Sequence, residues 1–134
     1  MASPSETVRR FYAAFGGGDT ETMWAILAPD VRWTAAGACG VVPWAGAAHT
    51  REAAMVSIEA WRGAIEGLES QRELPLSDGE CVVVRGQGRY RVRSTNRVVA
   101  DRWVHMWQVR GGRIIAFDEY GDTAAAAAGF AGAR

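Results

Sequence analysis

The sequence contains no lysine: its 15 basic residues are all arginines, and 15 acidic residues balance them. The absence of lysine excludes catalysis through a lysine Schiff base, and it excludes a phosphate-binding loop that depends on lysine. The net charge of zero provides no overall field that would attract nucleic acid or an anionic membrane. We therefore expect neither nucleic acid nor a membrane among its partners.

Cysteine and histidine are scarce, with two residues of each in the chain. Cys39, His49, Cys81 and His105 include no closely spaced pair of the kind that binds zinc. No Ser or Cys lies in a nucleophile-elbow pattern, and the glycines at 86 and 88 lack the rest of a dinucleotide-binding fingerprint. The sequence therefore predicts no metal and no other cofactor.

Long apolar runs are also missing. The longest uncharged stretch, residues 33–49, contains three glycines and a proline, and it is shorter than the roughly 18 apolar residues of a membrane helix. Residues 1–6 have neither the basic nor the apolar segment of a signal peptide, which predicts a cytoplasmic protein. A length of 134 residues, with 49% hydrophobic and 22% charged residues, predicts one globular domain spanning residues 1–134.

Helical signals occupy the first half of the chain. Residues 3–6 form a capping box with proline at the first helical position, and the glycines at 16–18 end the helix that follows. Asp19 can cap a second, short helix that must end before Pro29. A longer helix is predicted to open at residues 50–53 and to end near Gly67.

Strand signals follow, because the hydrophobic period changes from 3.6 to 2. After a first strand at residues 30–35, the pattern predicts strands near 69–76, 80–93, 98–110 and 113–120. Helices followed by consecutive antiparallel strands indicate an α+β fold with the helices on one face of a curved sheet. The alanine run at 124–128 predicts a short or frayed terminal helix, which Asp122 could cap.

Several local motifs share this order of elements. They are Val8–Phe15 followed by Gly18-Asp19, then Val42–Gly46, Asp101–Trp107, and Gly112–Ile115 with Glu119–Thr123. Together they resemble a bacterial subgroup of the SnoaL-like branch of the superfamily that contains nuclear transport factor two and ketosteroid isomerase. The resemblance implies a cone-shaped α+β barrel, in which N-terminal helices pack on a strongly curved, mostly antiparallel sheet around one pocket. It also implies a homodimer.

The resemblance does not extend to the catalytic residues of ketosteroid isomerases. Phe11 stands where those enzymes carry an oxyanion-hole tyrosine, and Ala35 stands where they carry the base aspartate. Asp101 falls at the position of their second oxyanion donor, so one member of the set is retained. Steroid isomerisation by that mechanism is therefore not expected.

A second comparison within the superfamily concerns limonene-epoxide-hydrolase-like enzymes. These use an arginine, an aspartate two residues later and an aspartate on the last strand, and the matching positions are Arg85, Gln87 and Glu119. Gln87 lacks the carboxylate, which weakens a prediction of epoxide hydrolysis.

Alternation along strands predicts which side chains share a face. Asp101, Trp103, His105 and Trp107 share one face of their strand, and Phe117 and Glu119 share one face of the last strand. With the inward direction taken from the resemblance, a polar set is predicted to converge in a mostly apolar pocket. The polar members are Arg85, Gln87, Asp101, His105 and Glu119, and the apolar members are Phe11, Phe15, Trp33, Trp61, Trp103 and Phe117.

This set could perform acid-base chemistry without a cofactor on a small hydrophobic, polyketide- or steroid-like molecule. Asp101 or Glu119 would be the base, His105 would donate or accept a proton, and Arg85 would orient a carboxylate or stabilise negative charge. The reaction would be an isomerisation, cyclisation, dehydration or hydrolysis. The alternative is a noncatalytic binding module or dimeric assembly module, in which Arg85 and a carboxylate form a structural network and His105 is a core residue.

Two further features have more than one interpretation. Trp44 lies in the uncharged loop beside Pro43, where it could form the lip of the pocket or a dimer contact. The arginines at 85–97 alternate with apolar residues, which indicates a solvated strand end and not a nucleic-acid interface.

Overall fold

A computed structural model describes residues 2–132 of the chain. The elements, in chain order, are α1 (Pro4–Gly17), α2 (Thr20–Ile26), β1 (Leu27–Ala35), β2 (Gly46–Ala48), α3 (Arg51–Ala64), β3 (Ile65–Arg72), β4 (Leu76–Asp78), β5 (Cys81–Val92), β6 (Val98–Arg110), β7 (Arg113–Gly121) and α4 (Thr123–Phe130). This arrangement confirms the predicted α+β class.

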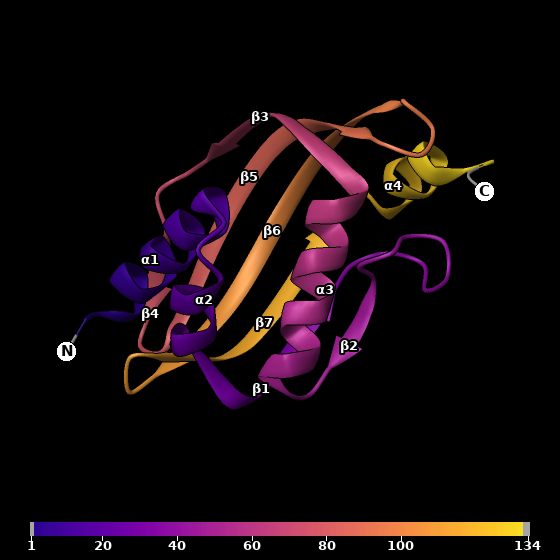
Figure 1. Cartoon of the computed structure of the whole chain (residues 1–134). Coiled ribbons are helices and arrows are strands. Elements are labelled where there is room, and N and C mark those ends of the chain that lie inside the picture. Colours follow the sequence, from indigo (N-terminus) through magenta and orange to yellow (C-terminus); the bar gives the residue numbers. More distant parts are fainter. Residues whose placement is uncertain (1, 133–134) are drawn as a thin grey trace.

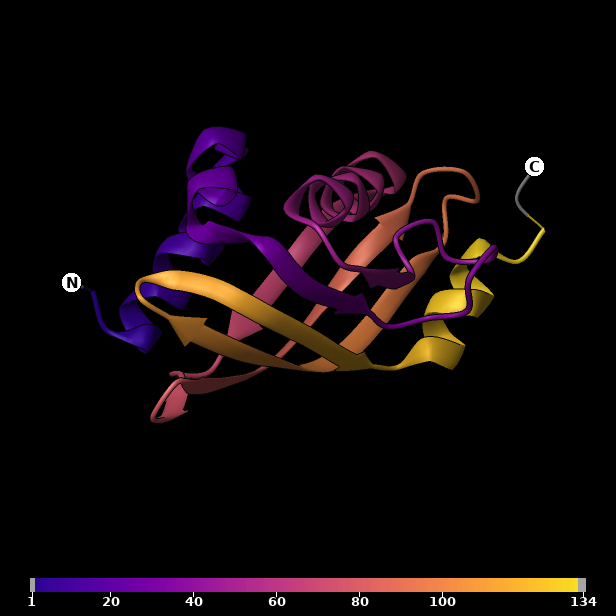
Figure 2. The same cartoon turned by 90° about the horizontal axis from the view of Figure 1, so that it is seen from below.

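The strands form one curled sheet with the order β2-β1-β7-β6-β5-β3, and β4 pairs with β5 beside this path. β1 and β7 are parallel, whereas the other neighbours are antiparallel. The sheet does not close, because β2 and β3 remain its edges. α1, α2 and α3 lie over the concave face, and α4 lies at one end of the sheet (Figures 1 and 2).

The predicted caps begin the helices. In α1, Ser3 Oγ accepts from the Glu6 amide and a Glu6 carboxylate oxygen accepts from the Ser3 amide, which confirms the capping box. Asp19 and Thr50 accept hydrogen bonds from the first turns of α2 and α3. Gly18 ends α1 in the left-handed conformation, with φ of 69°, which glycine adopts without steric cost.

The boundaries differ from the prediction around α3 and β3. The helix ends at Ala64, and β3 begins at once because Ile65 is buried opposite Val92 of β5. The predicted strand at 69–76 is divided into β3 and β4, since Pro75 between them has no amide hydrogen for a ladder. The three residues of β2 lie in the stretch predicted to be a loop.

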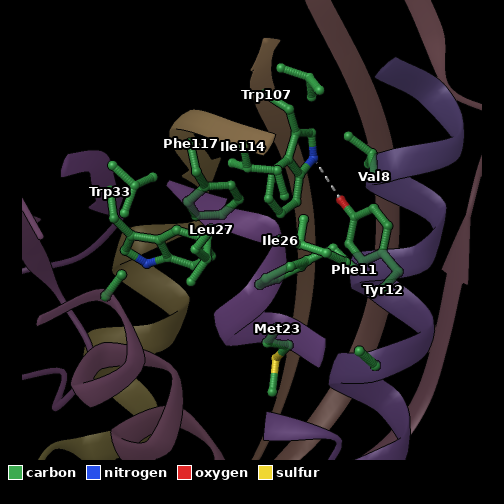
Figure 3. Close-up of a cluster of buried hydrophobic side chains, with 14 of the residues drawn as sticks. Val8, Phe11, Tyr12, Met23, Ile26, Leu27, Trp33, Trp107, Ile114 and Phe117 are labelled. Atoms are coloured by element: carbon green, nitrogen blue, oxygen red, sulfur yellow. Dashed lines mark hydrogen bonds between the residues drawn. The ribbon is translucent and has the colours of Figure 1, made fainter. Parts of the chain in front are cut away.

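Two hydrophobic clusters lie beneath the helices. The larger joins α1 and α2 to β1, β6 and β7, and its aromatic centre includes Phe11, Trp33 and Trp107 (Figure 3). The smaller cluster joins Trp44, Tyr90 and Phe130. None of the helices within residues 2–132 has the length and apolar character needed to cross a membrane.

The terminal helix α4 docks on the smaller cluster. Asp122 caps it by accepting from the Ala125 amide at 2.9 Å, and Ala126 and Phe130 are buried. Close approach to β6 depends on Gly129, because a Cβ atom there would lie 2.5 Å from Val99 Cγ2. The predicted short terminal helix is therefore confirmed, and it contributes to the core.

Gly129→Ala is expected to lower the free energy of unfolding by about 1–3 kcal/mol, although alanine favours helices, because the added methyl group overpacks the contact with Val99. Gly63→Ala near the end of α3 is the matched control, since no atom lies within 4 Å of its added Cβ. The control should be neutral or stabilising by up to about 1 kcal/mol. Urea denaturation of both variants checks this, and equal effects would contradict the packing argument.

Candidate functional site

A cavity of about 180 Å³ lies between α1, α3 and the concave face of the sheet. Its walls are mostly aromatic: Phe11, Tyr12, Phe15, Trp33, Trp44, Trp61, Tyr90, Trp103, Trp107 and Phe117 all line it. Asp101, His105 and Glu119 line the same cavity, so the structure brings together these three polar residues of the predicted set. Alternation along β6 and β7 thus predicted the face on which these side chains lie.

A chain of hydrogen bonds connects α1 to both central strands of the cavity. Tyr12 Oη lies 2.7 Å from His105 Nδ1, and His105 Nε2 lies 3.0 Å from a Glu119 carboxylate oxygen. Trp107 Nε1 donates to Tyr12 Oη at 3.2 Å, as drawn in Figure 3. The second Glu119 oxygen accepts from the Ala36 amide at 3.2 Å.

When Glu119 is ionised, the hydrogen bonds in this chain determine which atoms of His105 and Tyr12 carry a hydrogen. The carboxylate only accepts, so His105 Nε2 carries a hydrogen and donates to Glu119. Nδ1 of the neutral ring is then an acceptor, and the Tyr12 hydroxyl donates to it. If the Tyr12 oxygen accepts a proton from a ligand, its own hydrogen can pass to His105, and the resulting imidazolium ion is stabilised beside Glu119.

Burial holds this chain in a low-dielectric setting. The side chains of His105 and Glu119 are 13% and 23% exposed, and the His105 ring stacks on Trp103 with centroids 4.2 Å apart. Burial raises the pKa of the Tyr12 hydroxyl above its usual value, although the Trp107 hydrogen bond opposes this. Tyr12 is therefore neutral in the unliganded protein.

Trp103 takes its position because β5 has no side chain beneath it. Gly86 lies opposite Trp103 in the sheet, and a Cβ atom at residue 86 would lie 2.1 Å from the indole ring. The indole therefore occupies the space that a side chain of residue 86 would need.

Asp101 forms a second polar position in the cavity, four residues from His105 on the same face of β6. This spacing separates their Cα atoms by roughly 13 Å, at about 3.3 Å per residue. Asp101 Oδ1 accepts from the Asp122 amide at 3.0 Å, and no basic side chain within residues 2–132 forms an ion pair with it. Burial raises the pKa of this carboxyl group, and the Asp122 amide partly opposes the effect.

The raised pKa of Asp101 predicts a dependence of stability on pH. A carboxyl group with a higher pKa in the folded state binds protons preferentially there, so it lowers stability as the pH rises from its unfolded pKa through its folded pKa. Asp101→Asn is therefore expected to stabilise the protein at neutral pH but not below the unfolded pKa. Thermal unfolding between pH 3 and pH 7 checks this, and a constant difference across that range would contradict it.

Arg85 and Gln87 do not belong to the cavity, so their predicted placement was wrong. Arg85 is 71% exposed and forms a bidentate pair with Glu73, at 2.8 and 2.7 Å. Gln87 is exposed and donates to Gln71 at 3.4 Å. The reason is strand alternation, because the even-numbered residues of β5 face the core and Arg85 and Gln87 lie on the opposite face.

Two neighbouring arginines of β5 pair with acidic residues of β3, and the first of these pairs, Arg89 with Glu69, also borders the cavity. Arg89 pairs with Glu69 at 2.9 Å, and Arg91 approaches Glu66 at 3.9 Å across the same pair of strands. The exposed side chains of both pairs agree with the prediction that the arginine-rich segment is a solvated strand end.

Trp44 is buried, at 7% exposure, although its own loop is irregular. It packs edge-on against Trp61, Tyr90 and Phe130, and its carbonyl oxygen accepts from Ser57 Oγ at 2.8 Å. Of the two interpretations from the sequence, the structure supports the pocket position, because Trp44 lines the cavity.

Tyr12 was not among the predicted site residues. Its position beside Phe11 on the apolar face of α1 gave one signal, because a buried tyrosine hydroxyl needs a hydrogen-bond partner. That partner is 93 residues away, and no local pattern indicates it. Within residues 2–132, no three His, Cys, Asp or Glu side chains are grouped as a metal site requires.

Comparisons with known proteins agree with this architecture. The SnoaL-like domain family matches over residues 8–117. The chain is 32% identical to an NTF2-like protein from Burkholderia xenovorans, with 95% of each chain covered and a TM-score of 0.85. It is 29% identical to an NTF2-like protein of unknown function from Burkholderia pseudomallei, with 98% and 99% covered and a TM-score of 0.83.

A more distant neighbour from Mesorhizobium loti, described as a candidate SnoaL-like polyketide cyclase, is 19% identical. The alignment covers 89% of this chain and 99% of that one, with a TM-score of 0.70. None of the curated proteins compared with the chain is significantly similar to it.

Proposed function

Because this chain belongs to the SnoaL-like domain family, we propose that its cavity binds a small hydrophobic molecule and catalyses a cofactor-independent acid-base reaction on it. The observation that carries the proposal is the meeting of Tyr12, His105 and Glu119 in one hydrogen-bonded chain at an aromatic cavity. A fold shared by many functions does not decide the reaction, which depends on the residues of the site.

The site offers two proton-transfer positions at different points of one cavity. Asp101, with its raised pKa and no basic partner within residues 2–132, would accept a proton from the ligand. The Tyr12–His105–Glu119 chain would donate or accept a proton elsewhere on the ligand. This division suits an isomerisation, cyclisation, dehydration or hydrolysis, in which one position gains a proton while another loses one.

The size of the cavity favours a ligand of one or two rings. About 180 Å³ is less than the range of roughly 300–1,000 Å³ that is typical of drug-sized ligands. A polyketide-like ketone of one or two rings would therefore suit the cavity better than a steroid.

The alternative of a noncatalytic assembly module required a structural pair between Arg85 and a pocket carboxylate. Arg85 pairs with Glu73 outside the cavity, and Asp101 has no such partner among the described residues. These contacts favour the catalytic proposal.

Titration with small cyclic ketones and epoxides, followed by tryptophan fluorescence and by turnover, tests this proposal. Five tryptophans line the cavity, so a bound ligand should quench their emission. Ala35→Leu, which places a larger side chain on the cavity wall, should abolish the change, whereas Ala100→Leu on an exposed position of β6 should retain it. Saturation that is unaffected by Ala35→Leu, or no saturation with any compound, would refute the proposal.

We also propose that the chain forms a homodimer through the outer face of the sheet. Leu76, Val83, Val104, Met106 and Tyr120 lie in adjacent register on this face, and Leu76, Met106 and Tyr120 are exposed. Exposed apolar groups on adjacent strands are typical of protein interfaces.

Light scattering tests the proposed homodimer. The wild-type protein should have twice the mass of one chain, and Met106→Glu should have the mass of the monomer. A monomeric wild-type protein would refute the proposal.

A further inference from the structure

Most charged side chains around the cavity form ion pairs with one another, but one cation and one carboxylate do not. Arg89 pairs with Glu69 at 2.9 Å, and His105 pairs with Glu119 at 3.0 Å. Among residues 2–132, Arg72 and Asp101 line the same cavity without an ion-pair partner. A ligand that fills the cavity therefore meets an unpaired positive charge at one point and a carboxyl group at another.

Arg72 faces the cavity because of its register in β3. It lies opposite Gly86, which in turn lies opposite Trp103, and the side chains of this row point to the concave face. The guanidinium carbon lies 4.3 Å from the centroid of the Tyr12 ring. Stacking on a ring fixes the plane of the guanidinium group while its N–H groups stay available at the edge, and this fork matches a carboxylate.

An aromatic ring covers the sheet between Arg72 and Asp101. Gly86 contributes no side chain, and the Trp103 indole covers its backbone. Arg72 and Asp101 lie two strands and two residues apart in the sheet, so their Cα atoms are separated by about 12 Å, from strand spacings of about 4.8 Å and about 3.3 Å per residue. When the side chains of Arg72 and Asp101 extend over the Trp103 indole, the distance left between their charged groups suits a ligand of one ring or two fused rings.

We propose that the ligand is a planar, unsaturated carboxylic acid, whose ring lies on Trp103 and whose carboxylate binds Arg72. This inference rests on the proposed function and narrows its class of substrate. The acid places its ring between Asp101 and the Tyr12 hydroxyl, the two positions assigned above to proton transfer. Arg72 is a specificity-determining residue here, since it contacts the carboxylate and not the reacting atoms.

Three pairs of an acid and its amide test whether Arg72 binds a ligand carboxylate: benzoate with benzamide, cinnamate with cinnamamide, and 2-naphthoate with 2-naphthamide. The indole N–H signals of ¹⁵N-labelled protein provide the measurement. Five of the six tryptophans line the cavity, and Trp24, which lies beneath Arg51, is an internal control. At least one acid should shift the N–H signals of the cavity tryptophans but not the signal of Trp24. That acid should bind at least about tenfold more tightly than its amide, because its carboxylate forms charge-assisted hydrogen bonds with Arg72.

Substitutions at Arg72 separate this inference from the proposed function. Arg72→Gln should remove the preference for the acid, Arg72→Lys should retain part of it, and Arg110→Gln should leave it intact, because Arg110 pairs with Glu80 away from the cavity. Equal affinity of acid and amide in the wild-type protein, or an acid preference that survives Arg72→Gln, would overturn the inference alone. If no acid or amide shifts the N–H signals of the cavity indoles, the inference also fails, and the titration with cyclic ketones and epoxides decides the proposed function separately.

Discussion

His105→Ala is expected to lower kcat by about 10²–10⁴-fold, the usual contribution of a positioned acid-base group. His105 is the central member of the hydrogen-bonded chain Tyr12–His105–Glu119, so its loss separates Tyr12 from Glu119. Tyr12→Phe should lower kcat by a comparable factor, since it retains the ring but removes the hydroxyl. Steady-state kinetics with a compound turned over in the cyclic-ketone and epoxide screen provides the measurement.

Two controls make this expectation specific. If Tyr12 and His105 act as one unit, the double variant should be no slower than the slower single variant. Arg85→Gln should retain wild-type activity, because Arg85 pairs with Glu73 on the outer face of the sheet. If His105→Ala retains activity within twofold of the wild type, the Tyr12–His105–Glu119 hydrogen bonds have a structural role and not a catalytic one.

Gly86→Ala is expected to lower the free energy of unfolding by about 1–3 kcal/mol and to deform the cavity. The added Cβ atom would lie 2.1 Å from the Trp103 ring, so the indole has to leave its position against β5. Guanidinium denaturation measures the loss, and near-ultraviolet circular dichroism reports the displacement of the indole.

A double-mutant cycle identifies the cause. Trp103→Leu should restore part of the stability lost in Gly86→Ala, because the smaller side chain leaves room for the new methyl group. Gly88→Ala is the contrasting variant, since its added Cβ atom would lie 2.4 Å from the backbone oxygen of Glu69. Trp103→Leu should not rescue that variant. Additive effects of Gly86→Ala and Trp103→Leu would contradict the proposed clash.

The sequence predicts the fold well where a local pattern fixes the structure. The capping box at Ser3 and the cap at Asp19 begin two helices as predicted, and α3 begins at Arg51, within the predicted residues 50–53. Alternation along β6 places Asp101 and His105 in one cavity. Such features depend on neighbours in the chain, so a single sequence contains the information they require.

Errors arose where a resemblance was preferred to the strand's own pattern. In β5 the inward residues Val84, Tyr90 and Val92 are all even-numbered, and this alternation already places Arg85 and Gln87 on the opposite face. Long-range contacts were not predicted either. The burial of Trp44 against Phe130 and the bond from Tyr12 to His105 join distant parts of the chain, which no local period encodes.

The hydrogen bond from the Asp122 amide to Asp101 has a practical consequence for following the cavity in solution. This amide hydrogen lies directly against the carboxyl group, so its chemical shift and its rate of exchange with solvent should change when Asp101 gains a proton. Asp122 also caps α4, and the same ionisation should therefore alter how readily the first turn of that helix opens. One backbone amide thus offers a spectroscopic record of the charge inside the cavity before any substrate is known.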